Sequence, residues 1–135
     1  MSTNVTRNTL LGLRPAETKT TAAALPFRSL TLFQKSAGLT GREVASLLGW
    51  QERTLYRRKE EGCITRSESE KLRLAALVFA EIVGAFDGNM EKARVWIRKP
   101  AMALGGRTPL ALLGDGEGAL EVSRLAVRID RGVYT

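Results

Sequence analysis

The chain has 135 residues, of which 44% are hydrophobic and 26% are charged, which is the composition of a folded globular protein rather than of a disordered or membrane-embedded one. It contains no histidine and one cysteine, Cys63, so an internal disulfide, the usual zinc ligand sets and imidazole catalysis are excluded, and we expect no metal, cofactor or enzymatic activity. The formal net charge of +7 favours anionic partners such as nucleic acid.

The N-terminal segment, residues 1–27, is rich in Thr and Ala and shows no sustained hydrophobic period. Pro15 and Pro26 interrupt it, so we predict a mobile or loosely docked arm. The segment lacks the apolar core of a secretory signal, and no apolar run in the chain approaches the roughly 20 residues that span a bilayer. The expected location is therefore the cytoplasm.

Three short helices are predicted between residues 28 and 62. The first spans residues 28–37, where apolar side chains recur at intervals of three and four. The second begins after Thr40, because Thr40 and Glu43 have the spacing of a capping box, and it ends at Gly49. The third spans residues 51–61 and ends before a glycine.

The second and third of these helices have the pattern of a helix-turn-helix between Thr40 and Gly62. Such a motif needs small residues where its helices cross and where the turn bends, and Ala45 and Gly49 supply them. A purely structural helical hairpin would also carry Ala and Gly near its turn and is the alternative. The residues expected to pack the two helices together are Val44, Leu48, Trp50 and Leu55.

The second helix of such a motif enters the major groove of DNA with its N-terminal residues at the base edges. Arg53 and Arg57 lie one turn apart on one face, so we expect both to approach bases. Lys59 and Arg42 are better placed for phosphates. The residues predicted to contact DNA are Gln51, Glu52, Arg53, Thr54, Tyr56, Arg57, Lys59 and Arg42.

Arg58 departs from the motif, because it stands three residues after Leu55, where helix-turn-helix proteins usually bury an apolar side chain. We expect its aliphatic stem to cover the core while its guanidinium reaches water. The departure also leaves open a protein that has lost its affinity for DNA and binds only a protein partner.

A long helix is predicted for residues 67–86, after two candidate capping boxes that begin at Thr65 and Ser67. Its apolar residues form two stripes, so a single packing partner would cover too little of it. One stripe either packs on the C-terminal half or forms a two-fold interface. We expect a homodimer, because dimers commonly read two half-sites on DNA. The stripes are Leu72, Ala76, Phe79, Val83 and Phe86, and Leu74, Val78 and Ile82.

The C-terminal part, residues 87–135, is expected to form a small helical lobe in which Trp96 and Ile97 belong to the core. No segment alternates with the period of a strand, so the expected fold is all-α, with an arm at 1–27, a helix-turn-helix lobe at 28–86 and a second lobe at 87–135. The predicted elements of the second lobe are helices at 90–99, 109–113 and 119–131, a flexible loop at Gly114, Gly116 and Gly118, and a C-cap at Gly132.

Several stretches of the second half carry a shared pattern: residues 93–100 (Ala-Arg-Val-Trp-Ile-Arg-Lys-Pro), residues 103–110 (Ala-Leu-Gly-Gly-Arg-Thr-Pro-Leu), Leu112-Leu113, Glu117-Gly118-Ala119, Val122, Leu125, Arg128-Ile129 and Gly132-Val133. This pattern resembles the C-terminal domain of Xre antitoxins of the MbcA/ParS/Xre group, and Gly49 with Arg53-Thr54-Leu55 matches the preceding helix-turn-helix part. The resemblance covers about residues 30–135. It implies an antitoxin of a type II toxin–antitoxin system that represses its own operon and neutralises an NAD-consuming toxin of the RES class.

The surface most available to such a toxin is the last helix with the tail beyond Gly132. We hypothesise that Arg128, Arg131 and Tyr134, with the terminal carboxylate, reach the nucleotide pocket of the toxin and deny it substrate. A frayed terminus that binds nothing is the alternative. The residues expected to bind the toxin are Arg124, Arg128, Arg131, Val133, Tyr134 and Thr135.

A different function remains open for the same sequence. A stand-alone helix-turn-helix transcriptional regulator would share the DNA-binding half, and its C-terminal lobe would only dimerise or sense a ligand. The presence of a toxin partner separates the two functions.

Overall fold

The computed structural model describes residues 7, 9–12, 24–130 and 132, and over that part the fold is all-α, as predicted. The one β feature among these residues is an isolated antiparallel bridge between Pro26 and Cys63. None of the described helices combines the length and the apolar character that crossing a bilayer requires. The helices are α2 (Phe27–Ala37), α3 (Gly41–Leu47), α4 (Glu52–Glu61), α5 (Arg66–Ala85), α6 (Met90–Trp96), the 3-10 helix η2 (Met102–Leu104), α7 (Pro109–Leu112) and α8 (Gly116–Asp130).

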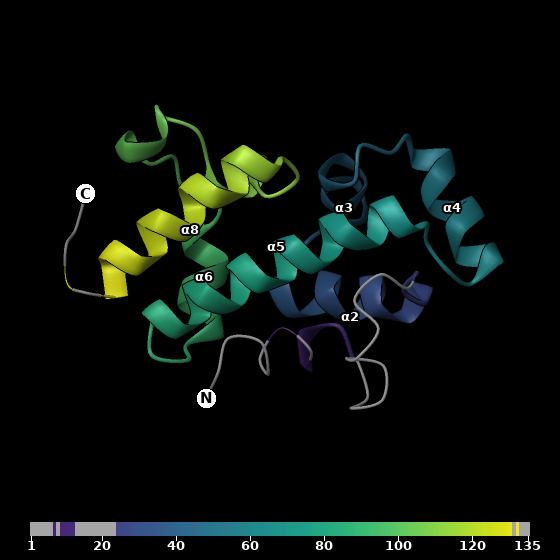
Figure 1. Cartoon of the computed structure of the whole chain (residues 1–135), viewed down its shortest axis with the longest axis horizontal. Coiled ribbons are helices and arrows are strands. Elements are labelled where there is room, and N and C mark those ends of the chain that lie inside the picture. Colours follow the sequence, from purple (N-terminus) through teal and green to yellow (C-terminus); the bar gives the residue numbers. More distant parts are fainter. Residues whose placement is uncertain (1–6, 8, 13–23, 131, 133–135) are drawn as a thin grey trace.

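Helix α5 is the central element, and both halves of the chain pack on it (Figure 1). Helices α3 and α4 lie at its N-terminal end and α2 runs alongside it, whereas α8 lies along its C-terminal part and α6 packs near its end. The predicted burial of α5 on two sides is confirmed, since residues of both stripes are buried. The buried apolar residues of α5 are Leu72, Ala75, Ala76, Val78, Phe79, Ala80, Ile82 and Val83.

One continuous hydrophobic core joins the two halves. Phe33 of α2 packs edge-on against Phe79 of α5, with ring centroids 6.1 Å apart. Two arginines of the C-terminal half also bind the end of α2: Arg94 donates to the carbonyl of Ser36 at 2.8 Å and Arg98 to that of Gly38 at 2.7 Å. Because the C-terminal end of a helix carries partial negative charge, these cations are favourably placed there.

The described part of the N-terminal segment docks on this core. Leu10 and Leu11 are buried, and Gly12 lies against the side chain of Leu32 in α2. The backbone N–H of Leu25 donates to the buried hydroxyl of Ser69 at 2.8 Å, which links the segment to α5. For these residues docking, rather than mobility, is what the structure shows, while residues 13–23 lie outside the described part.

The predicted flexible loop at Gly114, Gly116 and Gly118 is wrong, because α8 begins at Gly116 and Gly118 is buried within it. A Cβ at position 118 would lie 2.9 Å from the carbonyl oxygen of Leu112. Glycine is a poor helix former, but here it allows α8 to approach the end of α7 closely. Packing against α7 therefore outweighs the low helix propensity of glycine at this position.

The other helix bounds differ from the predictions by a few residues. Helix α5 begins at the first of its two candidate capping boxes, with Thr65 as the N-cap. Helix α6 ends at Trp96, three residues earlier than expected. Helix α2 begins at Phe27, so the predicted arm and the first helix overlap by one residue.

Gly114 tests the packing of the two halves against each other. A Cβ at this position would lie 2.2 Å from the backbone oxygen of Leu47, so Gly114→Ala must displace either α3 or the start of α8. We expect the free energy of unfolding to fall by about 1–3 kcal/mol in urea denaturation. Gly116→Ala is the control, because a Cβ there meets nothing within 4 Å, and an equal loss in both variants would contradict this account.

Candidate functional site

The turn of the helix-turn-helix is built as its sequence predicted. Gly49 has a φ of 73°, in the left-handed region that favours glycine, and the N–H of Trp50 donates to the carbonyl of Ala45 at 2.7 Å. Ala45 is buried, and Leu55 of α4 also approaches Gly41 at the start of α3, where a Cβ would lie 3.3 Å from the leucine side chain.

Helix α4 projects from one end of the molecule and contains no buried residue (Figure 1). Its polar side chains consequently face solvent on most of its circumference. Of the residues predicted to contact DNA, all are exposed except Thr54, which is half-buried: Arg42, Gln51, Glu52, Arg53, Tyr56, Arg57 and Lys59 are exposed.

Two of these arginines form surface ion pairs. Arg42 lies 3.4 Å from a carboxylate oxygen of Glu52, and Arg57 lies 3.6 Å from one of Glu61. Exposed pairs of this kind contribute about 0–1 kcal/mol, so either guanidinium can leave its partner for a nucleic-acid phosphate or base at little cost. Arg53 forms no ion pair with any residue in the described part of the chain.

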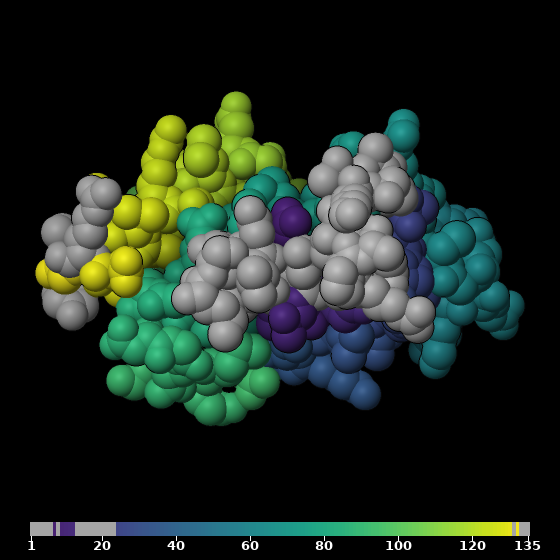
Figure 2. All heavy atoms as spheres, turned by 60° about the horizontal axis from the view of Figure 1, so that its bottom comes forward, coloured from purple at the N-terminus to yellow at the C-terminus, as the bar shows by residue number. Residues whose placement is uncertain are grey.

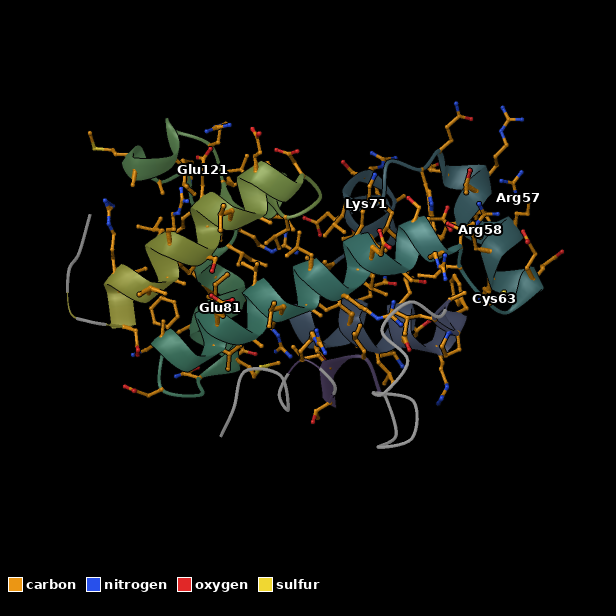
Figure 3. The ribbon with its side chains drawn as sticks, viewed as in Figure 1. Arg57, Arg58, Cys63, Lys71, Glu81 and Glu121 are labelled. Carbon is orange, nitrogen blue, oxygen red and sulfur yellow. The ribbon has the colours of Figure 1, made fainter. Side chains whose placement is uncertain are left out.

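Arg58 behaves differently from its neighbour Arg57, because it lies between α4 and α5 (Figure 3). Its Nε and Nη2 donate to the two carboxylate oxygens of Glu68 at 2.9 and 3.0 Å, and its Nη1 donates to Glu61 at 3.2 Å. Only 15% of the side chain is exposed. The expectation that this guanidinium reaches water is wrong, since a carboxylate of α5 receives it.

Glu68 is held in place by the first turn of α5. The N–H of Thr65 donates to its Oε1 at 2.8 Å and the indole N–H of Trp50 to its Oε2 at 2.6 Å. Burial raises the pKa of this carboxyl, but the hydrogen bonds from Arg58, Thr65 and Trp50 outweigh it and lower the pKa to about 2. One carboxylate therefore joins the turn, α4 and α5. We refer to Trp50, Arg58, Thr65 and Glu68 as the Glu68 network.

In the C-terminal half, Arg124 and Arg128 lie exposed on α8, one turn apart. Neither forms an ion pair with a residue that the structure describes. Arg131, Val133, Tyr134 and Thr135, which were also predicted to bind the toxin, lie outside the described residues. Nearby, Arg107 contacts Glu121 at 3.3 Å.

The predicted core residues Trp96 and Ile97 have different environments. Ile97 is fully buried, whereas Trp96 is half-buried and packs edge-on against Phe86, with ring centroids 6.1 Å apart. Trp96 therefore contributes one face to the core and leaves part of the indole at the surface.

Comparisons with known proteins match both halves. A sequence model described as the antitoxin Xre-like helix-turn-helix domain matches residues 16–76, and one described as the antitoxin Xre/MbcA/ParS C-terminal toxin-binding domain matches residues 79–132. The chain belongs to the Xre antitoxin family. The first match begins at residue 16, within the N-terminal segment, whereas the resemblance described above begins at about residue 30.

Two curated relatives support this assignment. The antitoxin Xre of Yersinia enterocolitica is 35% identical over 100 residues, which cover 73% of this chain and 68% of the relative. The antitoxin Xre of Photorhabdus laumondii is 33% identical over 94 residues, which cover 69% of this chain and 64% of the relative. A helix-turn-helix domain and a toxin-binding domain thus occur together in a member of an antitoxin family.

The Glu68 network was not predicted from the sequence of this antitoxin, although its parts were visible. The capping box of Thr65 and Glu68 was recognised, and Arg58 was recognised as a polar residue at an apolar position. The contact between Arg58 and Glu68 was not predicted, although their separation of ten residues across a glycine turn permits it.

The low pKa of Glu68 makes part of the stability dependent on pH. Because the folded-state pKa lies below the ordinary value of 4.5, this contribution is complete above about pH 4.5 and is lost as the pH falls towards 2. We expect Glu68→Gln to lose about 3 kcal/mol of unfolding free energy at pH 7 and to flatten its decline below pH 4.5. Urea denaturation across this range measures both effects.

Two further variants make this test specific. Glu60→Gln removes an exposed carboxylate from α4 and should leave the pH profile unchanged. The double variant Arg58→Leu with Glu68→Gln should lose less than the sum of the two single losses, because each substitution breaks the same pair. Additive losses would show that the two side chains do not stabilise the fold together.

Proposed function

We propose that this antitoxin neutralises an NAD-degrading toxin of the RES class and represses its own operon by binding DNA through α4. The family supports the coarser statement, an antitoxin with a helix-turn-helix and a toxin-binding domain. The RES class of the toxin comes from the resemblance of about residues 30–135 to Xre antitoxins of the MbcA/ParS/Xre group.

The observation that carries the DNA-binding half is the exposure of α4. The outward side chains of α4 include the guanidinium groups of Arg53 and Arg57, and Gln51 at its N-cap adds an amide; these groups match the base edges of DNA. Arg53 and Arg57 contact bases, while Arg42 and Lys59 contact phosphates. Gln51, Glu52, Thr54 and Tyr56 complete the interface.

Repression also requires two helix-turn-helix units that bind the operator together. A single helix-turn-helix binds weakly, and dimers that read two half-sites about one helical turn apart are the common solution. We therefore propose that the antitoxin binds its operator as a homodimer.

For the toxin-binding half, we propose that the end of α8 and the tail occlude the active site of the toxin. Arg124 and Arg128 are exposed and unpaired among the described residues, which supports a partner for them. Arg131, Val133, Tyr134 and Thr135 follow these two arginines in sequence. Entry of this segment into the nucleotide pocket of the toxin would exclude NAD.

DNA binding is tested by an electrophoretic shift on the promoter of the operon. We expect Arg53→Ala and Arg57→Ala each to weaken specific binding by about tenfold, since a bidentate arginine contact discriminates by about 1–3 kcal/mol. Lys59→Ala should weaken binding to all sequences and lower the salt dependence by about one counterion. Lys92→Ala, on the other half of the molecule, is the control. If both arginine variants bound the promoter DNA as tightly as the wild type, α4 would not recognise the bases.

Toxin occlusion is tested by deleting residues 132–135. We expect the truncated antitoxin to lose neutralisation of the toxin encoded beside it, measured as NAD consumption in a mixture of the two purified proteins. DNA binding should stay unchanged, which controls for folding. Full neutralisation by the truncated chain would show that the tail does not block the active site.

Copurification of the antitoxin with the adjacent gene product separates this proposal from a stand-alone regulator. A regulator without a toxin partner would bind its promoter in the shift assay and would copurify with nothing encoded beside it.

A further inference from the structure

An apolar groove opens at the C-terminal end of α5. It has a volume of about 330 Å³ and is lined by Phe86, at the end of α5, and by side chains of α6 and the turn that follows it. Its floor is the edge-on pair of Phe86 and Trp96. The remaining lining residues are Glu91, Lys92, Val95 and Lys99.

This groove exposes side chains that folding would normally bury. Val95 remains 51% exposed, and Trp96 leaves part of its indole at the surface. Grouped exposed apolar side chains around an aromatic residue are typical of protein–protein contact sites, where tryptophan often contributes much of the binding energy. The groove therefore suits an apolar side chain of another protein.

The charges around the groove indicate what that protein carries. Lys92 and Lys99 line it, and neither forms an ion pair with a residue in the described part of the chain. The one acidic residue of the lining, Glu91, is already paired with Arg94. The rim is thus positive, and carboxylates beside the entering apolar side chain would complement it.

The position of the groove connects it to the end of α8. Ala85 lines a neighbouring hollow together with Asp130 at the end of α8, and Phe86, the next residue, lines the groove. Helix α6 and the end of α8 lie at the same end of α5 (Figures 1 and 2). A partner held by the end of α8 would therefore extend over the groove. Both also lie within the stretch that matches the toxin-binding domain.

We propose that this groove is a second docking site for the toxin, which inserts an apolar side chain from a segment that also carries carboxylates. The proposal rests on the proposed function, because it assumes that a toxin is the partner. The groove contributes affinity for the toxin, whereas the tail blocks the active site of the toxin.

The test measures the affinity of the full-length antitoxin for the toxin encoded beside it, by calorimetry at two salt concentrations. Val95→Glu places a carboxylate at an exposed site of the groove and should weaken binding at least tenfold. The double variant Lys92→Glu with Lys99→Glu should weaken it similarly, and the loss should be smaller at high salt. Met102→Glu is the matched control, since Met102 is 92% exposed in the same half but does not line the groove.

Three outcomes would overturn the proposal. Wild-type toxin affinity in both groove variants would show that the toxin does not use the groove. Altered self-association of the free antitoxin, with toxin affinity unchanged, would assign the groove to a second copy of this chain. Weakened DNA shifts with unchanged toxin affinity would assign the two lysines to phosphates. If wild-type antitoxin itself does not bind the toxin, the proposed function fails instead.

Discussion

The carboxylate of Glu68 is the group on which the geometry of the DNA-binding half depends. Helix α4 has no buried residue, so apolar burial holds it only through the half-buried Leu55. The remaining attachment is polar: the bidentate contact with Arg58, supported by Trp50 and by the first turn of α5. Because hydrogen bonds are directional, the Glu68 network fixes the angle of α4 as well as its position.

A second carboxylate repeats this arrangement between the halves of the molecule. Glu43 closes the capping box of α3 and also accepts from Arg98, which lies beyond α6. The hydrogen bond from Arg98 lowers the pKa of Glu43, with a smaller contribution from Thr40, against the effect of burial. The starts of α3 and α5 thus both use a carboxylate of the local capping box as the acceptor for an arginine from another part of the chain, so each carboxylate combines a local cap with a tertiary contact.

The features predicted correctly from the sequence were those with local causes. Both capping boxes, the glycine turn and the two-sided burial of α5 follow from residues within a few positions of each other. The errors arose where distant residues decide. The guanidinium of Arg58 was expected to be solvated because its partner, Glu68, lies in the first turn of another helix. Gly118 was expected in a loop because its close neighbour, Leu112, belongs to α7. The face that Trp96 leaves exposed depends on Phe86 in the same way.

Helix α5 belongs to both functional halves, and the two family matches meet within it, between residues 76 and 79. A break there would separate Phe79 from Ala76 in one continuous helix and open the core on both sides. We therefore expect the two halves to unfold together rather than one at a time. It follows by mass action that any partner binding only the folded chain, at either end, lengthens the lifetime of the other end against proteases. The turnover of the helix-turn-helix half is then set partly by how much partner is present.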